Sequence, residues 1–593
     1  MRIRIGLALT LALLTAVPAD AARDVFVRDS PRSGAATCLR PAGSPGMVGL
    51  IGAVRSRMSP YELLRVSATG VTLAGTARLG VLDQCPALAA APNGHAIVAG
   101  SVWRERRRVI RIALAEPGGD FRAPVDIAGT RAGPVSMAAA ISPRGDAVVA
   151  WTLMRPVRRR AEAGTRVVAA LRPAGGGFGR PRFLTPWRRG SFFPFAAVSA
   201  AMDASGTATV AWVQPAPDRR DISGLHRVEV ATARPGEQFA EAQAVAGPVQ
   251  DTEPVALAVQ ADGRALLAHD GRDTIELYER GPGMSRFERV DAWPGRARHP
   301  GWETPALALA PDGSAVLAWR GNAAAGNEDV FLSSRKGSGP WTVPARVQRS
   351  RDREDLGASG WVYGPFGASP PADFEGGGLR VAISDTDGYL VSWTRERRTA
   401  LGDLLLEARM VRGEAGGTPS RPQAAGCRCR TVEGVLPLAV SGGDPLLAYT
   451  DNVTSMLAFG LEVPRESGRL HVATPGRRAA GPAPPRVTVR RPRGATLGEE
   501  DRLRVRVGCD GPCDLRAYVV GGAGHARGLG TATLRRAGST PLAIRPPFER
   551  HLAPPRGGRA RLLVHGYAPN GHRFTRRSVA VELRRERARQ ASG

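Results

Sequence analysis

The chain has 593 residues, a net charge of +28 and a pI near 11.3. Its length exceeds one ordinary domain and predicts a large folded unit with a smaller companion. Lys336 is the one lysine; every other basic residue is an arginine, amid abundant Ala, Gly and Pro, a skew typical of high-GC, actinobacterial-like sequences. No nucleic-acid-binding module gathers these arginines, so the charge predicts general attraction to anionic polymers rather than nucleic-acid binding.

Residues 1–21 have the layout of a signal peptide. Arg2 and Arg4 precede an apolar run over residues 5–17, and Ala19 and Ala21 fit a small-residue cleavage site. The run is too short to span a membrane, and no later stretch offers about 18 uninterrupted apolar residues. We therefore expect a secreted, extracellular or cell-envelope protein with no transmembrane segment after cleavage.

From residue 85 to residue 475 one unit repeats. The stretch 304–320, TPALALAPDGSAVLAWR, consists of an apolar run, an Asp-Gly turn and a second apolar run that ends on tryptophan. The turn glycines of the successive copies are Gly94, Gly145, Gly206, Gly263 and Gly313, with looser copies at Gly388 and Gly443. Each turn is expected to need a positive φ. The second half of the unit runs through a strand ending near arginine, a glycine-rich turn, an aromatic residue and a proline.

Each copy therefore supplies four short strands, and the copies recur at intervals of 50 to 75 residues. Such a repeat of strands and turns is typical of propeller blades. The sequence predicts an all-β fold: a β-propeller of about seven blades, with six to eight allowed. Residues 22–84 are expected to add strands that close the ring.

Aromatic residues recur at one place in the unit. They are interpreted as packing residues between blades, because a periodic aromatic is more often core than ligand platform. This interpretation covers Trp151, Trp212, Trp319 and Trp393, and the residues that replace tryptophan, His269 and Tyr449.

After the repeats, residues 476–485 form a Pro/Gly/Ala linker. Residues 486–585 alternate apolar and polar positions in short runs, which predicts a small immunoglobulin-like β-sandwich. A basic tail, 586–593, follows.

Six cysteines in an exported chain favour disulfides over a metal–thiolate site. Cys509 and Cys513 flank a Gly-Pro turn and are predicted to pair. Two arrangements stay open for the others: two links between the N-terminal segment and the late repeats, or Cys38–Cys85 with Cys427–Cys429. No histidine lies near them at zinc-ligand spacing, and no metal site is predicted.

The strand–PDG–strand–Trp unit with its G-x-F-x-x-P second half resembles bacterial exported β-propellers of the sialidase-like and WD-repeat-like superfamilies, without pointing to one family. The resemblance implies a scaffold on which glycosidases also occur. The sialidase Asp-box, S/T-x-D-x-G-x-x-W, is missing, because Asp312 and Gly313 are adjacent and Trp319 stands six residues beyond Gly313. Activity therefore does not follow from the resemblance.

In a propeller, the turn between the first and second strands of a blade lies on one face. The loop between the second and third strands, and the crossover to the next blade, lie on the other. Here the second class is long and rich in arginine and aromatic residues, a pattern that suits an anionic or sugar-like ligand. The candidate ligand-binding residues are Trp187, Arg188, Arg189, Trp293, Trp302, Trp361, Tyr363 and Phe366.

The sequence favours an exported, non-enzymatic binding protein whose ligand is a glycan, a cell-wall polymer or another protein. One alternative is a secreted carbohydrate-active enzyme, a glycoside hydrolase or lyase; another is a structural envelope protein. We identify no catalytic residue, metal-ligand set or cofactor motif. The ligand's identity and the oligomeric state do not follow from the sequence.

Overall fold

A computed structural model of the chain describes most of the repeat region and most of the C-terminal strands. The described residues are 23–29, 38–41, 47–51, 61–67, 70–80, 86–104, 107–155, 164–189, 198–215, 226–249, 255–271, 274–294, 305–322, 328–348, 379–398, 404–425, 431–440, 443–452, 469–474, 485–490, 495–497, 503–520, 526–544, 558–567 and 574–585. Within them, no helix has the length and apolar character needed to cross a membrane.

The strands up to residue 474 form eight antiparallel sheets, seven of four strands and one of five. Written from the innermost strand outward, the sheets are β2 (Cys38–Pro41), β3 (Met47–Ile51), β4 (Tyr61–Ser67), β5 (Gly70–Ala77); β6 (Ala87–Ala90), β7 (Ala96–Arg104), β8 (Arg107–Ala115), β9 (Val125–Thr130); β10 (Gly133–Ile141), β11 (Ala147–Met154), β12 (Gly164–Arg172), β13 (Arg182–Phe183), with β14 (Arg188–Arg189) also on β12; β15 (Val198–Met202), β16 (Ala208–Pro215), β17 (His226–Ala233), β18 (Gln243–Val249); β19 (Ala256–Val259), β20 (Ala265–Asp270), β21 (Thr274–Arg280), β22 (Glu288–Pro294); β23 (Ala306–Leu309), β24 (Ala315–Asn322), β25 (Glu328–Arg335), β26 (Ala345–Gln348); β27 (Arg380–Ile383), β28 (Gly388–Arg398), β29 (Leu404–Glu414), β30 (Gln423–Ala425); and β31 (Thr431–Val440), β32 (Gly443–Asn452), β33 (Arg469–Thr474), β1 (Arg23–Asp29).

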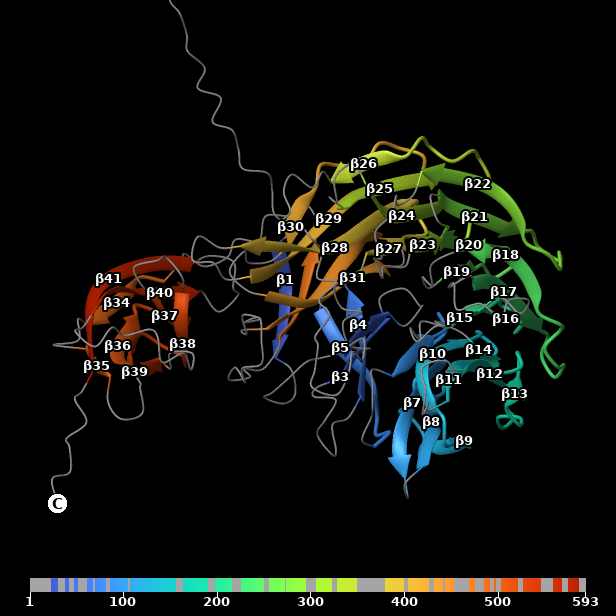
Figure 1. The fold of residues 1–593 in the computed structure, drawn as a ribbon, viewed down its shortest axis with the longest axis horizontal. Coiled ribbons are helices and arrows are strands. Elements are labelled where there is room, and N and C mark those ends of the chain that lie inside the picture. Colours follow the sequence, from blue (N-terminus) through green and yellow to red (C-terminus); the bar gives the residue numbers. More distant parts are fainter. Residues whose placement is uncertain are drawn as a thin grey trace, which may run out of the picture.

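The sheets form a closed ring. The innermost strands β2, β6, β10, β15, β19, β23, β27 and β31 contact one another in that order, and β31 also contacts β2. Figure 1 shows the sheets following one another in chain order around this ring. The predicted all-β propeller is therefore confirmed. The described strands give eight sheets, one more than the favoured seven and inside the predicted range.

The N-terminal residues enter the ring in two ways. Strand β1 pairs antiparallel with β33, from Arg23 opposite Thr474 to Asp29 opposite Arg469, and so becomes the outer strand of the last sheet. Strands β2 to β5 build a sheet of their own. This sheet accounts for the extra blade, because its strands carry neither the Asp-Gly turn nor the tryptophan of the unit at 304–320 and were not counted as a copy.

The turn glycines have the backbone conformation that the repeat predicts. Gly94, Gly145, Gly206, Gly263 and Gly313 all have φ between 88° and 101°. In the next copy the positive φ of 66° falls on Asp387 instead of Gly388, which explains why that copy is one residue short. A side chain at Gly206 would also collide with the carboxylate of Asp146 in the preceding sheet.

The recurring aromatic residues are core residues, as predicted. Trp151, Trp212, Trp319 and Trp393 are all at most 1% exposed, and His269 in the same position is also buried. The second strand of a sheet, as in β7, β11 and β16, is almost wholly buried because neighbouring sheets cover both of its faces. The side chain of Tyr449 lies outside the described residues.

The C-terminal strands form a β-sandwich. One sheet contains β34 (Val487–Arg490), β36 (Leu503–Cys509) and β39 (Gly538–Ile544); the other has the order β35 (Ala495–Leu497), β41 (Phe574–Arg585), β40 (Gly558–Tyr567), β37 (Cys513–Val520), β38 (Ala526–Leu534). Apolar side chains of both sheets share one core. The predicted Cys509–Cys513 disulfide joins β36 to β37. Cys85, Cys427, Cys429 and the side chain of Cys38 lie outside the described residues.

Candidate functional site

We call the side of the ring with the turns at 91–95, 142–146, 203–207, 260–264, 310–314 and 384–388 the turn face, and the opposite side the crossover face. Many crossover-face loops, including 156–163, 190–197, 295–304 and 349–378, lie outside the described residues. Trp302, Trp361, Tyr363 and Phe366 are among them and remain predictions. Arg189 lies in β14 opposite Gly164, and its side chain is also outside the described part.

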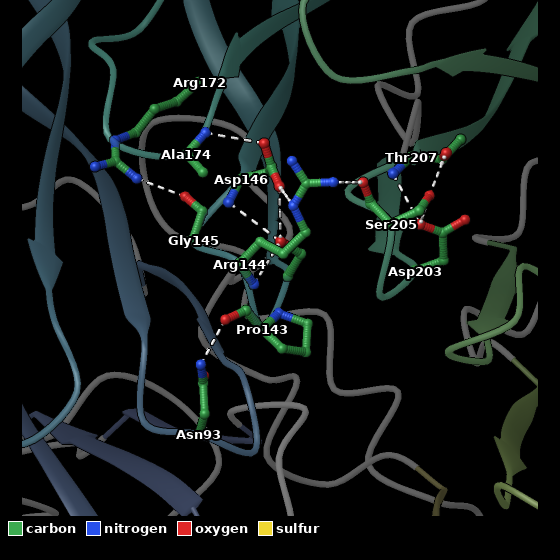
Figure 2. A network of polar contacts seen from close by, with 11 residues as sticks. Asn93, Pro143, Arg144, Gly145, Asp146, Arg172, Ala174, Asp203, Ser205 and Thr207 are labelled. Atoms are coloured by element: carbon green, nitrogen blue, oxygen red, sulfur yellow. Dashed lines mark hydrogen bonds and ion pairs between the residues drawn. The ribbon is translucent and has the colours of Figure 1, made fainter.

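Polar contacts link neighbouring sheets on the turn face, and Figure 2 shows the first two of them. The amide of Asn93 donates to the carbonyl of Pro143, and Arg144 Nη1 donates to the carbonyl of Ser205 at 3.1 Å. The backbone N–H of Ala204 then donates to Ala261, and the amide of Gln260 donates to Ala310. Four consecutive contacts thus link five neighbouring sheets.

The carboxylates of this face complete turns. Asp146 accepts hydrogen bonds from Ser142 and from the backbone N–H of Ala174, and Asp203 accepts from Thr207 and Ser205 (Figure 2). Their acceptor capacity is used in holding the chain, as expected of Asp in turns. The turn face is therefore scaffold.

Repeat arginines also serve the scaffold. Arg172 and Arg280 are buried, and each donates to the carbonyl of the turn glycine in its own sheet, Gly145 and Gly263 respectively. Arg335 forms a two-point ion pair with Glu279 of the preceding sheet. Part of the large positive charge is thus committed to holding turns and sheets.

On the crossover face, Arg155, Arg166, Trp187, Arg188 and Glu229 form what we call the arginine–tryptophan cluster. Short strand β14 pairs with the start of β12, and this pairing fixes Trp187 just before it. The guanidinium carbons of Arg155 and Arg166 lie 4.2 Å and 5.2 Å from the centroid of the Trp187 ring. The structure therefore brings one predicted residue together with two that the sequence analysis did not single out.

The cluster has a cationic part and a neutralised part. Arg188 Nη1 lies 2.9 Å from Glu229 Oε1 in the next sheet, and the indole N–H of Trp212 donates to Glu229 Oε2 at 3.0 Å. Arg188 also donates to the carbonyl of Pro215. Both charged side chains are mostly buried. Arg188, predicted as a ligand-binding residue, is thus placed as a bridge between two sheets.

Arg155 and Arg166 have no carboxylate partner among the described residues. Burial and the nearby positive charge of Arg155 lower the pKa of Arg166 from its usual value. Arg166 also stacks on Phe183, which is exposed. Two guanidinium groups held beside one ring, with like-charge repulsion between them, form a site suited to an anion.

Trp293, predicted as a ligand-binding residue, lies in strand β22 and is buried. Its side chain is only 7% exposed and stacks on Trp319 with ring centroids 5.6 Å apart. Trp341 contacts it edge to face. The reason is that β22 extends through Trp293, so the residue belongs to a strand and not to the crossover loop.

Sequence reasoning did not select Trp103, which is 56% exposed at the end of β7 and has Arg108 over its ring at 4.9 Å. Residues 103–109 belong to the arginine-rich loops of the crossover face, but the contact depends on the cross-strand pairing of Trp103 with Arg108. Arg166 was missed for a similar reason: it lies within a strand, outside the loops that drew attention.

Two acidic residues near the crossover ends of other strands have a hydrogen-bond or ion-pair partner. Glu276 accepts a 2.6 Å hydrogen bond from Tyr278, whose pKa burial and that bond raise, and Asp329 pairs with Arg346. Burial lowers the pKa of His269 to about 4, so its imidazole is neutral at pH 7. The described residues contain no group of three or more His, Cys, Asp or Glu placed to hold a metal ion.

No family model and no curated protein matches the sequence. Among solved structures, the polysaccharide lyase Uly1 is similar at 8% identity and TM-score 0.34, with 78% of this chain and 94% of that chain covered. A Penicillium chrysogenum α-L-arabinanase is similar at 13% identity and TM-score 0.30, covering 53% and 98%. The Streptococcus pneumoniae sialidase NanB is similar at 8% and 0.32, covering 66% and 68%. At these scores we draw no functional argument from the similarities.

Proposed function

We propose that this chain is an exported, non-enzymatic binding protein and that the crossover face of its propeller binds an anionic polysaccharide. The observation that supports the proposal is the pair of guanidinium groups of Arg155 and Arg166 beside Trp187, without a carboxylate partner among the described residues. A carboxylate or sulfate bound between them would offset the repulsion that helps to lower the pKa of Arg166.

The indole ring restricts where the two guanidinium groups can lie, so less side-chain freedom is lost when they bind an anion. A polymer suits the face better than a small anion, because the preceding sheet carries another arginine beside an exposed tryptophan, Arg108 over Trp103. Two arginine–tryptophan pairs on one face match a ligand with repeated anionic groups. Trp302, Trp361, Tyr363 and Phe366 are proposed to extend the same surface.

The test compares polygalacturonate oligomers with their methyl-esterified, neutral counterparts as ligands of the full chain in calorimetric titrations. The wild type should bind the acidic oligomers and not the neutral ones. In Arg155→Gln/Arg166→Gln the affinity should fall at least about tenfold, since a hydrogen bond to a charged group contributes about 1.5–3 kcal/mol. Arg180→Gln/Arg234→Gln is the matched control, because it also removes two positive charges, at exposed arginines of the turn face.

Equal losses in the double variant and the control would mean that affinity follows net charge, and the proposed site would be rejected. Equal binding of acidic and neutral oligomers would reject the anionic ligand. Shortened oligomers after incubation with the wild type would replace the non-enzymatic proposal with a carbohydrate-active enzyme.

A further inference from the structure

The three-stranded sheet of the C-terminal sandwich has one apolar face and one basic face. Val487, Val505, Val507, Leu542 and Ile544 point into the shared core and are buried. The alternate residues of the same strands are exposed: Thr488, Arg490, Arg504, Arg506, Ser539, Pro541 and Ala543. The outer face thus has three arginines, surrounded by small neutral side chains.

Strand register brings the three arginines together. Arg490 in β34 lies directly opposite Arg506 in β36. Arg504 lies two residues before Arg506 in β36, on the same face. Their Cα atoms are therefore about 5 Å apart across the strands and about 7 Å apart along the strand. On β39 the residues opposite Arg504 and Arg506 are Ala543 and Pro541, which bring no charge.

A like-charge pair directly opposite on neighbouring strands is destabilising. None of the three guanidinium groups has a carboxylate partner in the described part of the chain. Asp510, just beyond β36, accepts a hydrogen bond from the backbone N–H of Arg486. The arginines therefore reduce the stability of the sheet and leave its outer face strongly cationic.

We propose that this face, which we call the arginine face, binds a linear phosphodiester polymer of the cell envelope through Arg490, Arg504 and Arg506. Guanidinium groups bind phosphate oxygens in a two-point geometry. The described residues of this face include no aromatic side chain on which a sugar ring could stack. Its ligand is recognised by charge along its backbone, unlike the ligand of the arginine–tryptophan cluster.

Counterion release gives this proposal a quantitative signature. The logarithm of the affinity for a single-stranded polyanion falls with the logarithm of salt concentration, with a slope of about −0.7 for each phosphate neutralised. Three arginines should contribute about −2 to that slope. Removing two of them should make it shallower by about 1.4.

The probe is a fluorescent abasic phosphodiester oligomer, titrated against the full chain at several salt concentrations. Arg490→Thr/Arg506→Thr should weaken binding at low salt at least about tenfold and make the slope shallower. Arg180→Gln/Arg234→Gln, which also removes two positive charges but elsewhere, should change neither the low-salt affinity nor the slope comparably. An unchanged slope in the double variant would overturn the proposal. So would binding of the wild type to vesicles of phosphatidylglycerol and phosphatidylcholine without binding to the oligomer, since the ligand would then be a membrane surface.

A stability measurement separates binding from folding. Because a repulsive pair is removed and threonine favours strands, the double variant should unfold at a temperature equal to or above that of the wild type in calorimetry. A lower unfolding temperature accompanied by lost binding would assign the arginines to folding and overturn the proposal. Retention of oligomer binding by Arg155→Gln/Arg166→Gln would show that the arginine face acts independently of the propeller site. Loss of oligomer binding in that variant would overturn the proposal that the arginine face is the binding surface.

Discussion

Replacing Arg335 with methionine tests whether ion pairs between sheets hold the propeller ring together. Arg335 ends β25, and its two terminal nitrogens lie 2.7 Å and 3.1 Å from the two carboxylate oxygens of Glu279 in β21. Arg264 Nη1 makes a third contact with the same carboxylate at 3.1 Å. The side chains of Arg335 and Glu279 are only 5% and 16% exposed, so water replaces little of the interaction when it is lost.

Removing one partner of a buried ion pair costs about 3–5 kcal/mol, since the remaining charge is left desolvated. Here Arg264 still neutralises Glu279, and we expect the lower end, about 3 kcal/mol. Glu279→Gln leaves Arg335 and Arg264 facing each other and should cost a similar amount. In the double variant the losses should not add: a coupling energy of about 2 kcal/mol is expected for groups in one network.

Urea unfolding followed by tryptophan fluorescence is the appropriate assay. All 10 tryptophans precede residue 475, with Trp393 the last, so the signal reports on the propeller alone. Arg264→Met serves as the matched control and should cost about 1 kcal/mol, because Arg264 is the more exposed arginine. Additive losses in the double variant, with a coupling energy below about 0.5 kcal/mol, would refute the reasoning.

Three further outcomes are expected. Gly206→Ala should lower the free energy of unfolding by roughly 3 kcal/mol, because its φ is 88° and a Cβ would collide with Asp146; Gly175→Ala, at φ 71° with no neighbour near, should cost only about 1 kcal/mol in the same urea assay. Burial raises the pKa of Glu279, but the combined opposing effect of Arg335 and Arg264 is larger and leaves that pKa below its usual 4.5. The stabilisation of the folded state by ionised Glu279 should be complete above about pH 4.5 and be lost as the pH falls through the lowered pKa. Glu279→Gln should remove that part of the acid-unfolding profile. Cys509→Ser/Cys513→Ser should destabilise the sandwich by roughly 2 kcal/mol, since the closed loop is short, and leave the tryptophan-monitored transition unchanged.

The sequence predicted the features that depend on local chemistry. Turn glycines followed by apolar runs predicted the sheets from β6 onward, and the Gly-Pro turn predicted the Cys509–Cys513 disulfide. The sheet of β2 to β5 carries none of these marks and could not be counted from the repeat. Its place in the ring depends on contacts of β2 with β6 and with β31, and β31 is distant in sequence.

The candidate site was predictable only in part, because its geometry comes from pairing between distant strands. Trp187 was selected from its loop, yet Arg155 reaches it from just after β11 and Arg166 from β12. Trp293 was expected in a crossover and lies in a strand, where packing on Trp319 outweighs exposure. No alternation of buried and exposed positions marks Arg166, because a continuous buried run follows it in β12, so the sequence offered no signal for its place beside the ring.

The pairing of β1 with β33 gives the ring a defined mechanical weak point. Arg23, the first residue of β1, lies opposite Thr474, the last residue of β33, so the two chain ends of the propeller leave it side by side. A force that pulls these ends apart would peel the two strands open, breaking their perpendicular hydrogen bonds one pair after another instead of all together. Tension between the N-terminus and the C-terminal sandwich would therefore open this seam at low force, while the other seven sheets, each made of consecutive strands, would bear none of it until β1 had detached.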